Sequence, residues 1–180
     1  MEMSRIENRR ISYMLLAQLT EKALTPQTAT AAGLEAGPEE TVESLGRDFT
    51  YYFRGVYRDN FGLPAYESVW RKRKGEQISY PVLMSVRNFL AKCGIQATAK
   101  DQPDFISTEF GVMAWLIAKE EDTGDPKYAE WQREWLTDHM LPWIPDFCRS
   151  LKESCPSAAY QNLAEYIMAL MDEEREEEVK

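Results

Sequence analysis

Several features that usually mark metal proteins are missing from this sequence. Its 180 residues include one histidine, His139, and three cysteines that form neither an even set nor a Cys-x-x-Cys pair. A multi-histidine metal site is therefore excluded, and a disulfide framework or structural zinc site is disfavoured. The Glu-x-x-His pair of a carboxylate-bridged di-metal bundle is also missing. We expect no metal and no other cofactor.

Long apolar runs and positive charge are equally scarce. No run approaches the roughly 18 apolar residues that a membrane span needs. The formal net charge of −9 argues against nucleic acid and anionic membranes, because both partners need clustered lysines and arginines. Reduced cysteines and the lack of a membrane span favour a cytoplasmic protein.

Sequence motifs for catalysis are also lacking. The chain has neither the Gly-x-x-x-x-Gly-Lys-Ser/Thr loop nor the Gly-x-Gly-x-x-Gly turn that commonly bind phosphates. A nucleophilic pair of Cys148 and His139 would need two residues on a broken helix to meet, and a buried cysteine is the favoured interpretation. We therefore expect that the protein is not an enzyme.

Apolar residues, by contrast, are abundant and follow a helical spacing. They make up 44% of the chain, enough for one core, although two closely packed subdomains remain an alternative. The predicted fold class is all-α, a single-domain helical bundle over residues 1–171, followed by an acidic tail at 172–180. Helices are predicted over 5–24, over 38–57 with Pro38 in the first turn, over 81–93, over 103–121, from Asp125–Pro126, and from Pro156 with Tyr160, Leu163, Ile167 and Leu170 facing inward.

The helix predicted over 103–121 carries two apolar stripes and should be largely buried. Its stripes are Ile106, Phe110, Met113 and Ile117 on one side and Phe105, Val112 and Leu116 beside them. Glu109 lies among the second set, and a buried carboxylate needs a partner. Further along, Pro142 and Pro145 should bend or break the chain near Trp143.

The first predicted helix contains Arg9-Arg10 followed by an apolar run, which superficially matches a twin-arginine export signal. However, Glu2 and Glu7 lie in its would-be basic region, and Thr20-Glu21-Lys22 continues the run as an amphipathic helix. A first core helix is the favoured interpretation.

Carboxylates and aromatic residues suited to a basic, partly apolar peptide are the most suggestive polar features. A carboxylate can hold a planar guanidinium through two hydrogen bonds, and Asp104 and Glu67 are the first candidates. Asp104, in the first turn after Pro103, is also favoured by the helix dipole alone, and its oxygens should be exposed. Tyr66 and Trp70 lie in a long connection at 58–78, where core packing is the alternative to peptide contact.

Three segments in sequence order carry a family resemblance. They are Leu63-Pro-Ala-Tyr-Glu-Ser-Val-Trp-Arg71, Pro103-Asp-Phe-Ile106 and Asp138-His-Met-Leu-Pro-Trp143, and the opening Arg10-Ile-Ser-Tyr-Met-Leu-Leu-Ala17 extends the likeness. The chain resembles the TorD/DmsD family of redox-enzyme-maturation chaperones. It departs from the family pattern at Phe105, where the family usually has histidine.

The resemblance implies a cytoplasmic, non-catalytic chaperone. Its partner would be the catalytic subunit of a molybdopterin-dependent oxidoreductase of the DMSO/TMAO reductase type, bound through its twin-arginine leader, its body or both until the cofactor is inserted. The chaperone itself would be a monomer or homodimer.

The predicted peptide-binding residues are Tyr66, Glu67, Ser68, Trp70, Pro103, Asp104, Phe105, Glu109, His139 and Trp143. For His139 a helix-surface or satisfied core histidine, and for Glu109 a buried structural pair, are the alternatives to peptide contact. The alternative functions are a helical adaptor or scaffold, and a NarJ-like assembly factor for a molybdoenzyme that is not exported.

Overall fold

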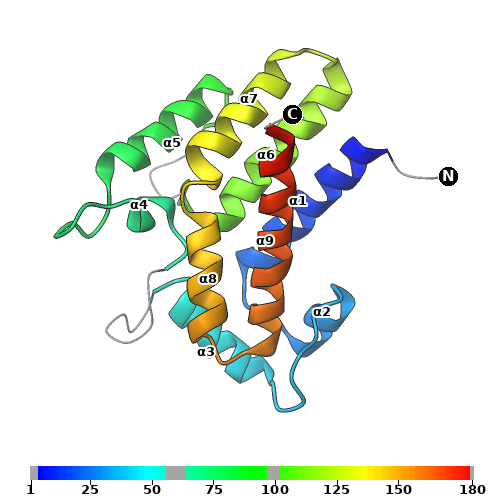
Figure 1. Ribbon diagram of the computed structural model, residues 1–180, viewed down its shortest axis with the longest axis vertical. Helices are drawn as coiled ribbons and strands as arrows, with labels where there is room; N and C mark the ends of the chain where they lie inside the picture. The colour runs from blue at the N-terminus through cyan, green and yellow to red at the C-terminus, as the bar shows by residue number, and fades with distance from the viewer. Residues whose placement is uncertain (1–3, 56–63, 97–101, 179–180) are drawn as a thin grey trace. The chain divides into compact units, whose positions relative to one another are not determined.

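The computed structural model describes residues 4–55, 64–96 and 102–178, and over these ranges the chain is helical with one isolated β-bridge and no strand (Figure 1). The predicted all-α fold class is therefore confirmed. Parts of the predicted helix 38–57, the predicted connection 58–78 and the acidic tail 172–180 lie outside the described residues. The chain forms two compact units, Met1–Glu21 with Tyr66–Pro142, and Lys22–Ala65 with Trp143–Lys180.

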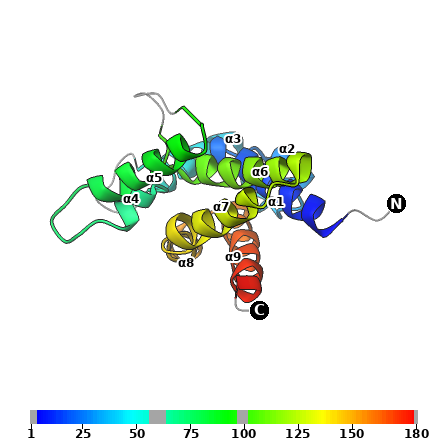
Figure 2. The ribbon, with the colours of Figure 1, turned by 90° about the horizontal axis from the view of Figure 1, so that it is seen from above.

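The first unit is built around α1 (Arg5–Glu21) and α6 (Ile106–Thr123), which lie side by side in both ribbon views (Figures 1 and 2). α1 buries Tyr13, Leu16 and Leu19, and the Tyr13 ring lies 6.1 Å from that of Phe110 in α6. α1 ends at Glu21, although the sequence predicted that it would extend to residue 24. It is a core helix, as favoured for this segment.

Both predicted apolar stripes of α6 are buried, which confirms the periodicity argument. The helix begins at Ile106 rather than Pro103, because Phe105 is the N-cap with an extended backbone. It ends at Gly124, whose φ of +65° is the left-handed conformation that glycine adopts without strain.

Shorter helices complete the first unit. They are α4 (Glu67–Trp70), α5 (Tyr80–Lys92), α7 (Lys127–Trp135) and the π-helix η2 (Leu136–Met140). The C-cap of α5 is Cys93, and Gly94 follows it in the left-handed conformation (φ +76°). α7 begins one residue later than expected, so Pro126 rather than Asp125 is its N-cap. The Oδ1 atom of Asp125 still accepts the backbone N–H of Lys127 at 3.0 Å.

The second unit begins with two helices that start at capping boxes. Thr25 and Thr28 cap α2 (Pro26–Ala31), a helix that was not predicted, and Thr41 and Ser44 cap α3 (Val42–Tyr52). The expected start of α3 at Pro38 is therefore wrong. The reciprocal threonine–serine bonds satisfy two backbone N–H groups at once, and the helix therefore starts at Val42, four residues after Pro38.

The second unit continues with α8 (Ile144–Ser154) and α9 (Ala158–Glu178), which pack side by side (Figure 2). The predicted break near Trp143 is confirmed, because its backbone (φ −144°, ψ −32°) separates η2 from α8. α9 buries Tyr160, Leu163 and Ile167 as predicted. Met171 is buried too, whereas Leu170 is only half-buried.

Aromatic rings form the core of the second unit. The Phe53 ring lies 4.9 Å from Phe49, 5.4 Å from Phe147 and 5.3 Å from Tyr160 between centroids. The Tyr160 hydroxyl donates to the carbonyl of Leu45 (3.1 Å) and accepts the N–H of Leu24 (3.0 Å). This buried phenol therefore joins the polypeptide before α2 to α3 and α9.

One buried carboxyl in this unit gives a pH-dependent prediction. Burial raises the pKa of Asp48 above its usual value, against the opposing effect of Arg47, whose Nε lies 3.5 Å away; the nearby Glu40 carboxyl raises it further. A raised pKa in the folded state means that folding favours the protonated form, so stability declines as pH rises through that pKa. We expect Asp48→Asn to increase the melting temperature at pH 7, with the increase vanishing below the ordinary pKa of 3.8. Melting curves from pH 3 to 8 would measure this, and an equal shift at every pH would contradict it.

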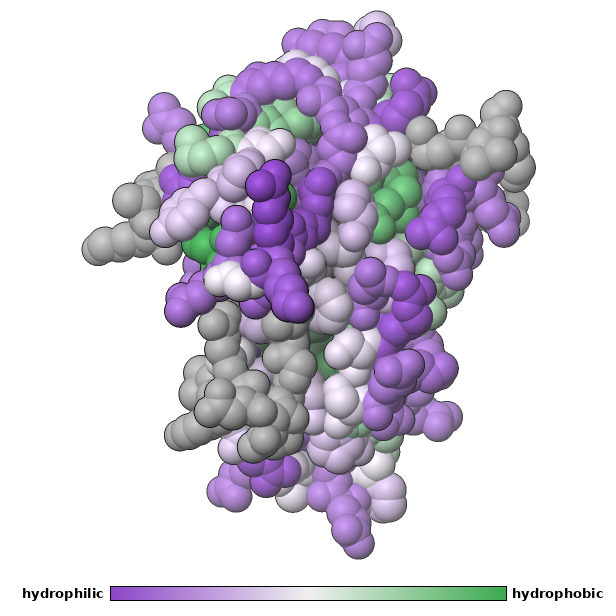
Figure 3. All heavy atoms as spheres, turned by 60° about the vertical axis from the view of Figure 1, so that its left-hand side comes forward, coloured by the Kyte–Doolittle hydropathy of each residue, from purple (hydrophilic) through white to green (hydrophobic). Residues whose placement is uncertain are grey.

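The surface is largely hydrophilic on the face shown in Figure 3, with hydrophobic residues in small patches. On α1, however, Ile11 and Met14 are 41% and 42% exposed and lie three residues apart on one side of the helix.

Candidate functional site

Two segments that are distant in sequence form the candidate site by binding each other through their backbones. Tyr66 and Phe105 form the isolated antiparallel bridge. The Glu67 N–H donates to the carbonyl of Asp104 (2.9 Å), and the Ser68 N–H donates to Asp104 Oδ2 (3.1 Å). Asp104 is therefore a cap for the start of α4, and the expected exposure of its oxygens is wrong, since the residue is 4% exposed.

Glu67 is completely buried and connects α4 to η2. Nδ1 of His139 lies 3.0 Å from Oε2 and 3.3 Å from Oε1 of Glu67. Because an ionised carboxylate only accepts hydrogen bonds, Nδ1 is the donor. The Arg71 guanidinium pairs with the same carboxylate and also donates to the carbonyl of Asp138 (2.6 Å). The Glu67 charge is thus balanced inside the protein.

The His139 ring is packed against two aromatic side chains. Its centroid lies 4.5 Å from that of Trp135 and 5.8 Å from that of Phe89. The Trp135 indole N–H donates to the carbonyl of Glu109 (3.1 Å), which ties α7 to α6. Glu109 itself is fully buried. The His139 side chain is therefore held by contacts with α4, α5 and α7.

The structure brings nine of the ten predicted site residues into the first unit. Only Tyr66 and Trp70 are partly exposed among them; the buried members are Glu67, Ser68, Pro103, Asp104, Phe105, Glu109 and His139. Phe105, which replaces the family's usual histidine, lies under the Tyr66 ring at 5.0 Å between centroids. Trp143 lies in the second unit, where its ring is 6.0 Å from that of Phe147.

Thiol chemistry is disfavoured at all three cysteines. Burial raises the pKa of Cys93 to about 11 and that of Cys155 to about 12, and it raises the pKa of the fully buried Cys148 as well. These side chains are protonated at neutral pH, and the thiol is a poor nucleophile compared with the thiolate. Among the described residues, no group of three or more His, Cys, Asp or Glu side chains could hold a metal ion.

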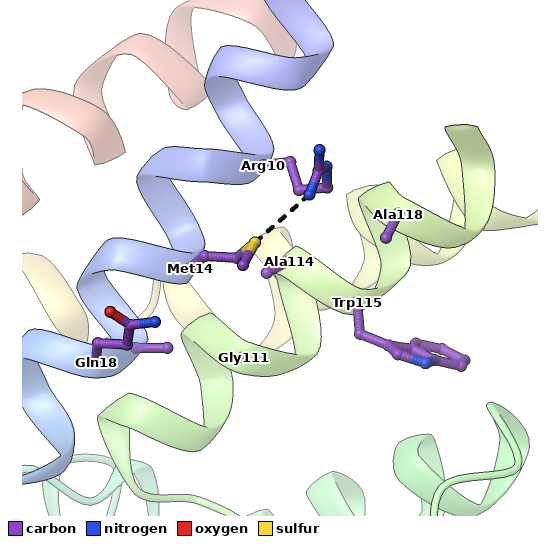
Figure 4. Close-up of a pocket in the computed structure, with 8 residues that line it drawn as sticks. Arg10, Met14, Gln18, Gly111, Ala114, Trp115 and Ala118 are labelled. Carbon is purple, nitrogen blue, oxygen red and sulfur yellow. Dashed lines mark hydrogen bonds between the residues drawn. The ribbon is translucent and has the colours of Figure 1, made fainter. Parts of the chain in front are cut away.

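An apolar groove between α1 and α6 was not predicted (Figure 4). It has a volume of about 350 Å³, and its lining residues are Arg10, Met14, Ala17, Gln18, Gly111, Ala114, Trp115 and Ala118. Met14 and Ala114 face each other across it, and Trp115 extends outward from α6. The sequence signal for this groove is Gly111 inside a helical pattern, followed three and seven positions later by the small residues Ala114 and Ala118.

Partly exposed aromatic side chains held by buried hydrogen bonds, and an apolar groove in the same unit, are features suited to binding another polypeptide. The model of the nitrate reductase delta subunit family matches residues 15–149, three quarters of the chain, and the protein belongs to this family. The resemblance to redox-enzyme-maturation chaperones is thereby confirmed. Members are assembly factors for molybdoenzymes rather than catalysts, and they bind the catalytic subunits. No curated protein matches the chain significantly.

The described helices include none that is both long enough and apolar enough to cross a membrane.

Proposed function

We propose that the protein is a cytoplasmic chaperone that binds the twin-arginine leader, and also the body, of a molybdopterin-dependent oxidoreductase of the DMSO/TMAO reductase type. It would hold this client until the cofactor is inserted, before export. The observation that carries the proposal is that the family match over 15–149 contains the two segments that meet at Tyr66 and Phe105.

The proposed contact residues are Tyr66 and Trp70, because they are the partly exposed members of the cluster. A client guanidinium would stack on these aromatic faces, an interaction worth about 0.5–2 kcal/mol. Glu67, Asp104 and His139 act as positioning residues, since their polar atoms already bond within the protein. The other buried residues of the cluster help to hold the contact residues in place. They are Ser68, Pro103, Phe105 and Glu109.

A second candidate is a NarJ-like assembly factor for a molybdoenzyme that is not exported. The family description as a nitrate reductase delta subunit favours it. Phe105 favours it too, because this buried residue supplies no polar group where leader-binding relatives are expected to have histidine. The two candidates differ in whether the leader or the body of the client is recognised.

Calorimetry with a leader peptide from a molybdoenzyme encoded beside this gene would test the proposal. We expect saturable binding that weakens when the peptide arginines become lysine, because lysine lacks the planar guanidinium. Tyr66→Ala should weaken binding about tenfold, or about 1.4 kcal/mol. Tyr80→Ala is the matched control, since Tyr80 is 69% exposed at the start of α5, outside the cluster.

Three other outcomes discriminate among the candidates. Binding to the mature client but not to its leader would favour the NarJ-like factor. Equal losses for Tyr66→Ala and Tyr80→Ala would keep the function but move the site. Failure to bind either leader or client would leave a helical adaptor and reject the chaperone proposal.

A further inference from the structure

The segment that runs from α4 to the end of α5 is basic, although the whole chain is acidic. Residues 66–96 carry six basic and two acidic side chains, a net charge of +4, and since the whole chain carries −9 the remaining residues carry −13. The connection between the two helices extends beyond both of them in the two ribbon views (Figures 1 and 2). The positive charge is therefore concentrated in one projecting part of the first unit.

The first cation of this connection is used inside the protein, whereas the next three are not. The Arg71 guanidinium pairs with Glu67 and donates to the carbonyl of Asp138 (2.6 Å). Residues 72–74, Lys-Arg-Lys, form no ion pair with any residue that the structure describes, and two of the three are exposed. Their charges are therefore available to a partner.

The backbone of this basic turn, residues 72–76, is held in place. The Arg73 N–H donates to Oε2 of Glu76 (3.0 Å), and the Glu76 N–H donates to the Arg73 carbonyl (3.1 Å). The Glu76 carboxylate offsets one of the three positive charges, which leaves a net charge of +2 on the turn. The Ser79 N–H donates to the Ser68 carbonyl (2.7 Å) and ties the end of the connection to α4. Binding therefore orders little backbone, and this keeps its entropic cost low.

α5 presents apolar side chains and one further cation next to the basic turn. Tyr80 and Met84 are 69% and 51% exposed, and Arg87 follows three residues after Met84 on the same side of the helix. Arg87 pairs with no acidic residue that the structure describes. The other side of α5 is buried, where the Phe89 ring packs on Trp135. Tyrosine, methionine and arginine are the residue types that are enriched where proteins bind one another.

We propose that the basic turn and the outward side of α5 together bind an acidic segment in the body of the client's catalytic subunit. Its carboxylates would pair with the cations of the turn and with Arg87, and its apolar side chains would cover Tyr80 and Met84. Complementary charge selects such a segment and steers its approach. The inference rests on the proposed chaperone function and adds the surface that recognises the client body.

Charge argues against two other kinds of ligand. The arginines of a leader are repelled by a surface of the same sign, so the leader and the body are recognised at different places. Nucleic acids and anionic membranes are extended polyanions, and the charge of −13 on the remaining residues repels them. An acidic polypeptide segment avoids this repulsion because it can be as short as the turn that it contacts.

Lys74→Glu tests the inference, because it replaces one attraction by a repulsion. Binding of the mature catalytic subunit, made without its leader, should weaken about fivefold in calorimetry at low salt. Lys22→Glu is the matched control with the same change in net charge. Lys22 is exposed, belongs to the second unit and likewise pairs with no acidic residue that the structure describes. It should bind the subunit as wild type does, and both variants should melt at the wild-type temperature.

Salt separates the charged part of the surface from its apolar part. Raising the salt from about 0.05 M to about 0.5 M shortens the range of exposed charges, so the loss in Lys74→Glu should shrink. Tyr80→Ala should also weaken binding of the mature subunit about fivefold, through lost apolar burial, and this loss should persist at high salt. The leader peptide should bind to Tyr80→Ala with wild-type affinity.

Three results would overturn the inference. Wild-type affinity of Lys74→Glu and Tyr80→Ala for the mature subunit, with Tyr66→Ala still impaired toward the leader, would reject this surface and leave the proposed function intact. Equal losses in Lys74→Glu and Lys22→Glu would show that only net charge matters. A salt-dependent dimer that Lys74→Glu converts to monomer, with unaltered subunit binding, would make the surface a contact between two copies of the chain. If wild-type protein binds neither leader nor mature subunit, the surface and the proposed function are both rejected.

Discussion

Trp135→Ala should lower the free energy of unfolding by about 3–5 kcal/mol, the range for removing a large aromatic side chain from a core. Trp135 is completely buried, and its ring packs on Phe89 (4.7 Å between centroids) and on His139. The substitution also leaves the Glu109 carbonyl without its indole donor. Urea unfolding followed by circular dichroism would measure the loss.

Trp131→Ala is the control, one turn earlier on α7. Trp131 is only partly buried, and its contacts are the Tyr128 ring (5.5 Å between centroids) and the ammonium groups of Lys92 and Lys127. It should therefore lose much less stability. Equal losses of stability in Trp135→Ala and Trp131→Ala would show that the packing of Trp135 against Phe89 and His139 adds no stability of its own.

Glu67→Ala should destabilise the protein by about 3 kcal/mol, at the lower end of the range for breaking a buried ion pair. The lower end applies because the Arg71 side chain is 33% exposed and water can replace part of its interaction. His139, only 3% exposed, loses the acceptor for its Nδ1 proton. Glu67→Gln should lose less, since the amide oxygen can still accept one of these hydrogen bonds.

Glu130→Ala on the exposed side of α7 is the control and should leave the unfolding midpoint unchanged. Glu67→Gln also tests whether Glu67 only positions the contact residues or contacts the client itself. If it only positions them, Glu67→Gln should bind the client with near wild-type affinity at temperatures where it remains folded. A large loss of affinity in folded Glu67→Gln would instead mean that its carboxylate meets the client directly.

Helix type and burial could be predicted from sequence because both depend on local spacing. The stripes of α6 follow from the 3.6-residue period, and the end of α5 before Gly94 follows from the left-handed conformation of glycine. The end of α6 at Gly124 was not predicted, although it depends on the same property of glycine. The starts of α2 and α3 were missed although their signal is also local. Thr25 with Thr28, and Thr41 with Ser44, form capping boxes without the usual glutamate or glutamine at the third position.

The site could be predicted only in part, because its decisive contacts are distant in sequence. The motif residues indicated which side chains gather, but Ser68 and Asp104 are 36 residues apart, and Glu67 and His139 are 72 apart. No local pattern reveals that these carboxylates are already bonded, so burial was underestimated for Asp104. The groove was overlooked because α6 was assessed by its apolar stripes, whereas Gly111 and Ala114 contribute by being small.

The sequence order of the first unit has a consequence during synthesis. α1 is made well before its partner α6, which begins about a hundred residues later, after α2, α3, α4 and α5 have been translated. At about 5–20 residues per second, α1 waits for roughly 5–20 s before α6 can cover its apolar side. An assembly factor for another protein therefore passes through part of its own synthesis with the apolar side of α1 not yet covered by α6.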